Sequence, residues 1–186
     1  MNPYIFEYKS IALSWFMFLT IISIWLGYRF VAKELAEELS GDKVEGLTMK
    51  VVIMGLIGSR LYYALEHWEL YQDHLFSIIQ ISPLTLDFKG ALIVGGLVLY
   101  LFSKKEKVGF KKILDSYAQA TTLGLVIGVW SYYFNNISSY LETLLLSIVL
   151  LVLFYLQGMI KSKSEKDGNL FWIFIIFYLV FNFIIL

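Results

Sequence analysis

The chain contains no cysteine, which excludes disulfide bonds, thiolate nucleophiles and cysteine metal sites. It has only 2 prolines and 2 histidines, and 15 basic residues balance 15 acidic ones. A net charge of zero gives no overall attraction to nucleic acid, so we expect no nucleic-acid partner. What the chain has in abundance is apolar sequence, with 59% hydrophobic and 18% aromatic residues. We therefore predict a single integral membrane domain over residues 1–186, because too little polar sequence remains for a second domain.

Six stretches are apolar enough to cross a bilayer, since a membrane span needs about 20 mostly apolar residues to cover ~30 Å of hydrocarbon. They cover residues 11–28, 48–66, 88–103, 113–134, 143–160 and 169–186. The predicted fold class is all-α: a polytopic membrane helix bundle with about six transmembrane helices.

The basic residues indicate the orientation of these spans, because short loops rich in lysine and arginine stay in the cytoplasm. Threading the chain through in order leaves only Lys9 and Lys89 on one side. The other side receives Arg29, Lys33, Lys43, Lys50, Lys104, Lys105, Lys107, Lys111, Lys112, Lys161, Lys163 and Lys166. This asymmetry predicts that both termini lie on the outer side of the membrane.

An apolar segment at residues 75–84 is too short to span and ends near Pro83. Apolar segments of 10–14 residues are typical of interfacial or re-entrant elements. We predict such an element near 75–88, and a pocket near the outer leaflet where the third span opens at Lys89-Gly90. Two further expectations concern polar residues. Residues 31–46 should form a charged cytoplasmic helix, and Asp115 should begin the fourth span and cap it.

Arg60 is the one basic residue well inside a predicted span, about six residues or ~9 Å from its outer end. Ionisable groups inside a bilayer are costly and usually mark function. A guanidinium at this depth can bind a lipid phosphate bidentately. The alternatives are that Arg60 extends to the interface, or that it pairs with Glu66 or Asp87.

Lys89, beside Asp87, is the second candidate cation for an anionic headgroup, and the alternative is a simple interfacial anchor. His67 and His74 lie near Glu66, Glu69 and Asp73 in the outer loop. Their spacing matches no tight helical pair of metal ligands, so we interpret them as surface residues and predict no metal site and no cofactor.

Several segments, in this order, resemble the bacterial prolipoprotein diacylglyceryl transferases. Gly58-Ser59-Arg60-Leu61-Tyr62-Tyr63 is similar to the family's Gly-Ala-Arg-Leu-Gly-Tyr stretch, and Asp87–Ile93 falls where the family has Ser-Phe-His-Gly-Gly-Leu-Ile. Weaker similarities lie at Met1-Asn2-Pro3, Ile11–Phe16, Leu114-Asp115, Leu123–Gly128, Tyr140–Glu142 and Gly168–Phe183. The resemblance implies a location in the bacterial plasma membrane.

The resemblance also implies a reaction, the transfer of a diacylglyceryl group from phosphatidylglycerol to the cysteine thiol of a preprolipoprotein. The family's motif histidine corresponds here to Lys89, and its signature arginine to Val129. A tyrosine of its first helix corresponds to Phe16, and a C-terminal arginine to Asn182. The external head domain that the family has before its last two helices is not recognisable, and we expect it to be absent. Loss of a cation that meets a phosphate in a low-dielectric pocket should abolish the ordinary reaction.

Three hypotheses follow. The first is a shortened, diverged relative that binds an anionic phospholipid, with phosphatidylglycerol expected, or a lipidated partner, through Arg60, Lys89 and Gly90 and without the family's chemistry. The second is an active transferase, with Lys89 and Arg60 as the candidate catalytic residues, acting on phosphatidylglycerol and a lipoprotein. The third is a membrane subunit of a transport or assembly complex, with a membrane-protein partner. Whether the chain is an enzyme stays open at this point.

Overall fold

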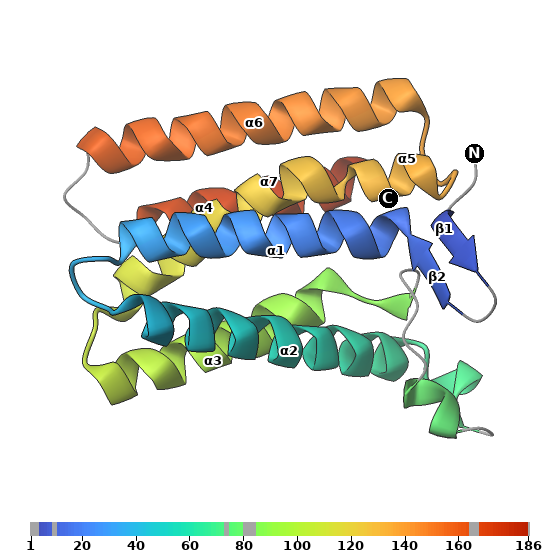
Figure 1. Cartoon of the computed structure of the whole chain (residues 1–186), viewed down its shortest axis with the longest axis horizontal. Helices are drawn as coiled ribbons and strands as arrows, with labels where there is room; N and C mark the ends of the chain where they lie inside the picture. The colour runs from blue at the N-terminus through green and yellow to red at the C-terminus, as the bar shows by residue number, and fades with distance from the viewer. Residues whose placement is uncertain (1–3, 9–10, 73–74, 80–84, 164–167, 186) are drawn as a thin grey trace. The chain divides into compact units, whose positions relative to one another are not determined.

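The computed structural model describes residues 4–8, 11–72, 75–79, 85–163 and 168–185 and is mostly helical (Figure 1). The chain forms two compact units, which we describe separately. The hairpin unit is residues Glu38–Phe110, and the bundle unit combines Met1–Glu37 with Lys111–Leu186.

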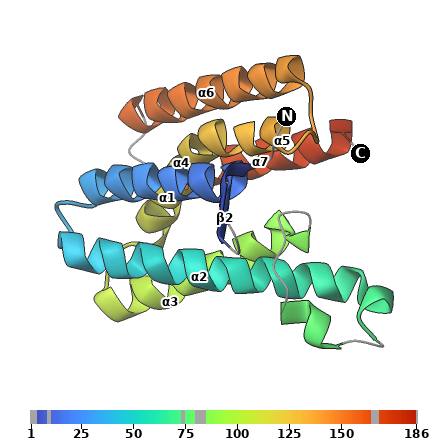
Figure 2. The ribbon, with the colours of Figure 1, turned by 45° about the vertical axis from the view of Figure 1, so that its right-hand side comes forward.

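The hairpin unit is built on two antiparallel helices, α2 (Gly41–Glu66) and α3 (Phe88–Glu106), which lie side by side in Figures 1 and 2. An ion pair marks each end of the pair. Lys43 Nζ lies 2.6 Å from Glu106 at one end, and Lys89 Nζ lies 3.1 Å from Glu66 at the other. Two short 3-10 helices, η1 (Trp68–Leu70) and η2 (Leu75–Ile79), belong to the segment that connects α2 to α3.

Glycine allows α2 and α3 to approach closely. A Cβ built on Gly90 would lie 2.3 Å from the carbonyl oxygen of Gly58, and one built on Gly58 would lie 2.5 Å from the side chain of Val94. Small residues let helix backbones meet in this way in membrane bundles, where water provides no hydrophobic driving force between helices. The contact fixes the position of the start of α3 along the axis of α2.

The bundle unit begins with an antiparallel pair of strands, β1 (Tyr4–Tyr8) and β2 (Ile11–Ser14), followed by α1 (Trp15–Glu34). Ser14 ends the strand and caps the helix, because its Oγ accepts a hydrogen bond from Met17 N at 3.2 Å. The prediction that the first helix starts at residue 11 is therefore wrong, because Ile11–Ser14 form β2 and the helix starts at Trp15. All other regular secondary structure of the described residues is helical.

The rest of the bundle unit consists of α4 (Phe110–Gly128), α5 (Trp130–Phe134), α6 (Tyr140–Lys163) and α7 (Asn169–Ile185). Phe134 stacks on Trp15 with ring centroids 4.2 Å apart, which joins α5 to α1. Ser147 Oγ donates to the carbonyl oxygen of Val126 at 3.2 Å, which joins α6 to α4. The predicted continuous span over 113–134 is thus divided between α4 and α5.

Asp115 lies in the second turn of α4, so the prediction that it starts and caps this helix is wrong. Its carboxylate instead accepts backbone hydrogen bonds from Gly168 N at 2.6 Å and Phe171 N at 2.9 Å. Asp115 therefore caps the N-terminus of α7, where the first N–H groups have no partner within the helix. The predicted charged helix over 31–46 is also wrong, because α1 ends at Glu34 and α2 already starts at Gly41.

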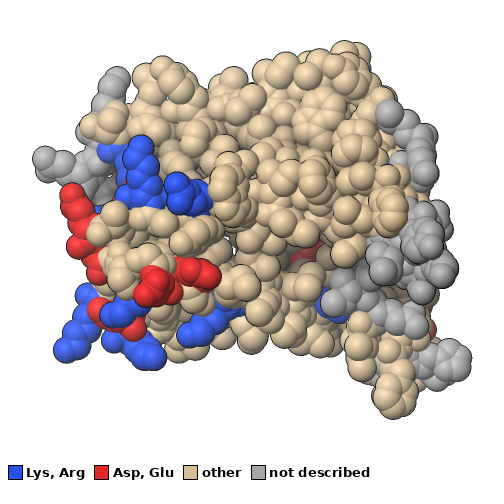
Figure 3. Space-filling model, viewed as in Figure 1, with Lys and Arg blue, Asp and Glu red and all other residues tan. Residues whose placement is uncertain are grey.

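Two helices, Trp15–Glu34 and Tyr140–Ser162, are long and apolar enough by length and composition to cross a membrane. A shorter apolar helix lies at Asn169–Val180. Most of the described surface on the face drawn in Figure 3 carries no charged side chain. The number of spans, the side on which the termini lie and the single membrane domain stay predictions.

Candidate functional site

Arg60 projects from α2 and is 5% exposed. Its Nε donates to the carbonyl oxygen of Ile78 at 2.7 Å, and its Nη2 donates to that of Ser77 at 2.7 Å. Its Nη1 donates to the Tyr71 hydroxyl at 3.0 Å and to the carbonyl oxygen of Thr85 at 3.1 Å. The guanidinium thus connects η1, η2 and the approach to α3. Four of its five N–H groups have neutral oxygen partners.

The partners expected for Arg60 from the sequence are different. Neither Glu66 nor Asp87 pairs with Arg60, so this alternative prediction is wrong. Within the described part of the chain, no carboxylate lies at ion-pair distance from the guanidinium. Buried arginines in membranes are often satisfied by backbone carbonyls, as here, and the positive charge itself is left without an acidic partner among these residues.

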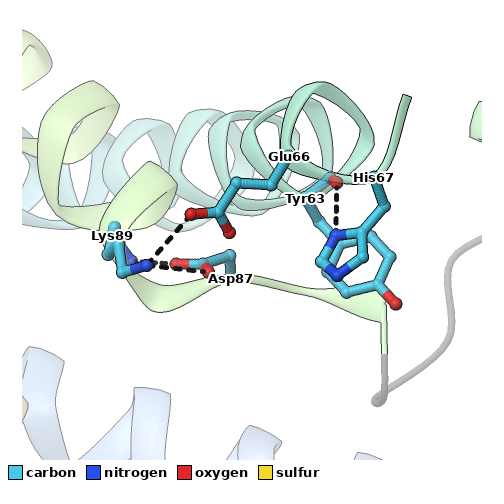
Figure 4. A network of polar contacts seen from close by, with 5 residues as sticks. All are labelled: Tyr63, Glu66, His67, Asp87 and Lys89. Carbon is cyan, nitrogen blue, oxygen red and sulfur yellow. Dashed lines mark hydrogen bonds and ion pairs between the residues drawn. The ribbon is translucent and has the colours of Figure 1, made fainter. Parts of the chain in front are cut away.

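Glu66 and Asp87, the carboxylates expected as alternatives for Arg60, both lie beside Lys89 instead (Figure 4). Lys89 Nζ lies 3.1 Å from Glu66 Oε1 and 3.8 Å from Asp87 Oδ2, and 5.5 Å from the ring centre of Tyr62. Asp87 is the N-cap of α3, and its Oδ1 accepts from Lys89 N at 2.7 Å. The lysine is half-exposed, so this is a solvent-accessible charge cluster at the end of the hairpin unit where the connecting segment joins α2 to α3.

Arg60 and Lys89 are linked through residues 85–87. Arg60 binds the carbonyl of Thr85, the N–H of Asp87 donates to the carbonyl oxygen of Ser59 at 3.2 Å, and Asp87 binds Lys89. The two candidate cations therefore occupy the same end of one structural unit. A shared recess between them stays a prediction.

Gly90 is buried, and its backbone lies against Gly58, as described above. This contact requires glycine for steric reasons alone. A role for Gly90 at a lipid headgroup stays a prediction.

Of the two histidines, His67 stacks on Tyr63 with ring centroids 4.2 Å apart, and its Nδ1 lies 3.0 Å from the carbonyl oxygen of Tyr63 (Figure 4). His74 lies outside the described residues. The described part of the chain holds no group of three or more potential ligands for a metal ion.

The remaining positions of the family comparison lie in the bundle unit. Val129, which the resemblance assigns to the signature arginine, is 6% exposed and forms the junction between α4 and α5. Phe16 lies in the first turn of α1, and Asn182 lies in α7, with a side chain outside the described part.

Sequence reasoning found Arg60 and Lys89 but missed the acceptors that hold Arg60. Three of these are main-chain carbonyls, which every residue carries, so no residue type marks them in a sequence. Tyr71 could have been identified, since a buried tyrosine hydroxyl needs a polar partner.

A mostly helical architecture, many exposed apolar side chains and a buried guanidinium within a helix are features typical of helical membrane proteins. The family described as prolipoprotein diacylglyceryl transferase matches residues 3–138. The chain belongs to this family, which is a family of polytopic proteins of the bacterial inner membrane.

Individual relatives agree with this assignment. The phosphatidylglycerol–prolipoprotein diacylglyceryl transferase of Acaryochloris marina is 32% identical over 137 residues, covering 73% of this chain and 50% of that protein. The proteins of the same name from Finegoldia magna and Clostridium botulinum are 30% and 31% identical, covering 73% of this chain and 55% and 54% of their own lengths. The chain thus spans about half the length of these curated relatives. The family match ends before α6, so the resemblance of α6 and α7 to the family's closing helices stays a prediction.

Proposed function

We propose that the chain is a diverged member of its family that binds an anionic phospholipid, with phosphatidylglycerol expected, or a lipidated partner. The binding region is the end of the hairpin unit that carries Arg60, Lys89 and Gly90, and the family's reaction does not take place there. The observation that carries this proposal is the charge of Arg60, which has no acidic partner among the described residues.

An uncompensated charge in a low-dielectric environment is costly, because neutral hydrogen-bond acceptors stabilise it less than an opposite charge does. A phosphodiester headgroup at the membrane surface supplies such a charge. The relatives named above are called after phosphatidylglycerol, a lipid with one such phosphodiester. Arg60 attracts the headgroup electrostatically while four of its N–H groups remain engaged with the chain.

Lys89 plays a supporting role in this proposal. Its side chain is half-exposed, but Glu66 and Asp87 already lie beside its ammonium. A headgroup phosphate therefore competes with Glu66 for the Lys89 ammonium. The affinity is expected to be modest and to fall with salt, because exposed ion pairs are screened.

The proposal of binding without chemistry rests on two positions. The resemblance assigns the signature arginine to Val129, an apolar and buried residue that cannot stabilise a departing phosphate. It assigns the motif histidine to Lys89, whose ammonium lies between two carboxylates. An ammonium in that setting is a cation for binding, not a base for a thiol proton.

A second candidate, an active transferase, is favoured by the names of the relatives. In that case Arg60 and Lys89 would stabilise the glycerol phosphate as the cysteine sulfur displaces it from the diacylglyceryl carbon. Only the active transferase would form a thioether, so this product distinguishes the two candidates.

The decisive experiment uses the full chain in nanodiscs of phosphatidylcholine with a minor fraction of labelled phosphatidylglycerol. Native mass spectrometry after gentle extraction counts the retained lipids and any bound subunit. We expect retained phosphatidylglycerol in excess of its share in the nanodisc, reduced severalfold in Lys89→Ala and unchanged in Lys50→Ala, an exposed lysine in the first half of α2. Lipid retained at its share in the nanodisc contradicts the binding proposal.

Two further arms separate the alternatives. Competition by soluble glycerol phosphate identifies a site for the phosphate group alone, whereas resistance to it identifies a site for the whole lipid. Addition of a peptide with a lipobox cysteine tests the chemistry, and a thioether product that disappears in Lys89→Ala would establish the active transferase instead.

A further inference from the structure

The short helix η2 carries the most exposed large apolar side chain of the described residues. Phe76 is 88% exposed and Ile79 is 75% exposed. They are three residues apart, and in a 3-10 helix side chains at this spacing lie on the same face. An exposed phenylalanine and isoleucine side by side need a partner surface, because soluble proteins seldom leave such groups in water.

Arg60 holds the backbone of η2. The carbonyl oxygens of Ser77 and Ile78 each accept from the guanidinium at 2.7 Å, the shortest of its four hydrogen bonds. Charge-assisted hydrogen bonds are about twice as strong as neutral ones. η2 is therefore attached to α2 by its backbone, and Phe76 and Ile79 are the side chains left outside.

Exposed side chains of α2, the helix that carries Arg60, indicate what the partner is. Four apolar residues at intervals of four follow one stripe of α2 and are all exposed: Ile53, Ile57, Leu61 and Leu65. Residues at this spacing lie above one another on a helix. Trp68 and Leu70 of η1, which follows α2 in the chain, are exposed too. In a family of membrane proteins, such a stripe faces lipid.

We propose that η2 is a wedge that inserts into the lipid at the outer edge of the hairpin unit. Arg60 is the positioning residue that holds the wedge, and the ligand of Phe76 and Ile79 is the bilayer itself. The wedge adds Phe76 and Ile79 to the lipid-facing side chains of α2. The proposal does not depend on the binding of phosphatidylglycerol, since apolar side chains enter any bilayer.

The absence of cysteine from the chain makes a direct test available. Single cysteines at Phe76 and Ile79 carry a nitroxide label, and Glu69→Cys, an exposed polar position in η1, serves as the matched control. The protein is placed in nanodiscs of phosphatidylcholine alone, without anionic lipid. Collision rates of the label with oxygen, which concentrates in the bilayer, and with a water-soluble nickel chelate report its depth.

We expect labels at 76 and 79 to collide mainly with oxygen and the label at 69 to collide mainly with nickel. A preference for nickel at 76 and 79 overturns the wedge. Protection from both reagents means that a protein segment covers these residues, which also overturns it.

The role of Arg60 is tested in the same labelled proteins. Arg60→Lys retains the charge but cannot bind four acceptors at once, because a lysine lacks the planar set of donors. Tyr71→Phe removes a single acceptor and leaves the bonds to Ser77 and Ile78 in place. We expect Arg60→Lys to reduce the oxygen preference at 76 and 79 severalfold, with a smaller change in Tyr71→Phe and none at 69. If the labels at 76 and 79 prefer oxygen and this preference does not change in Arg60→Lys, then Arg60 does not position η2. The contact of Phe76 and Ile79 with lipid would still hold.

Discussion

Gly58 and Gly90 face each other across α2 and α3 at a distance that excludes any side chain. A Cβ on Gly90 would lie 2.3 Å from the Gly58 carbonyl oxygen, and a Cβ on Gly58 would lie 2.7 Å from that of Gly90. Both obstacles include backbone atoms, which cannot rotate away as a side chain can. The contact holds the start of α3 next to Arg60 and Glu66.

Alanine at either glycine should therefore force the two helices apart. We expect Gly90→Ala and Gly58→Ala each to lower stability by about 1–3 kcal/mol, the usual cost of overpacking a core. Thermal unfolding in detergent, followed by far-UV circular dichroism, measures the change. Gly96→Ala in α3 is the control, because nothing lies within 4 Å of its Cβ position, and it should be neutral or slightly stabilising. Equal melting temperatures for Gly90→Ala and Gly96→Ala would refute the close contact.

Asp115 should be essential to the start of α7 although it belongs to α4. Asp115→Ala leaves the N–H groups of Gly168 and Phe171 without their acceptor, and we expect a loss of about 2 kcal/mol or more, since buried donors left unpaired are costly. Amide hydrogen exchange at the start of α7 should accelerate in parallel.

Asp115→Asn offers one carbonyl oxygen in place of two carboxylate oxygens and should fall between the wild type and Asp115→Ala. The control is Asp42→Ala, which removes an exposed carboxylate from the first turn of α2 and should leave α7 unaffected. Unchanged exchange at the start of α7 in Asp115→Ala would show that another group caps this helix.

Val129 provides a test of whether a phosphate pocket survives in the bundle unit. Val129→Arg restores the residue type that the resemblance assigns to this position. If no pocket remains, it buries an unpaired charge at a 6% exposed site and should cost several kcal/mol, roughly the 3–5 kcal/mol typical of a buried unpaired charge. The melting temperature in detergent should then fall sharply.

Val129→Met is the uncharged control for side-chain size and should be tolerated much better, because methionine adapts to irregular space. A Val129→Arg protein as stable as the wild type, and stabilised further by added phosphatidylglycerol, would reveal a retained anion site and favour the active transferase.

The ion pair between Lys43 and Glu106 should be visible in a titration. The hydrogen bond from Lys43 lowers the pKa of Glu106 from its usual value, and the charge of Lys43 acts in the same direction. Because the pKa is lower in the folded chain, the pair contributes stability above the ordinary carboxylate pKa. This contribution is lost as the pH falls through the lowered value.

Carbon-13 NMR of the Glu106 carboxyl measures this directly. We expect its midpoint to lie below that of an unpaired glutamate and to rise towards the ordinary value in Lys43→Gln. A Glu106 midpoint that does not change in Lys43→Gln would contradict the pairing.

The sequence by itself determined the features that depend on local composition. Long apolar stretches predicted α2, α3, α6 and α7 near their observed positions, because hydropathy and helical length are properties of a continuous segment. The order of short motifs was sufficient to recognise the family. The sequence also identified Arg60 and Lys89 as the cations at one end of the hairpin unit.

Only the tertiary structure decided the partners of these groups. From the sequence, Glu66 and Asp87 could pair with either Arg60 or Lys89. The close approach of α3 to α2 at Gly58 and Gly90 places both carboxylates beside Lys89. The acceptors of Arg60 are carbonyls of a distant segment, and Asp115 caps a helix more than fifty residues away in the chain. Every residue except proline carries the same backbone N–H and C=O groups. The hydrogen bonds of these groups are therefore set by the path of the folded chain and cannot be read from the residue types.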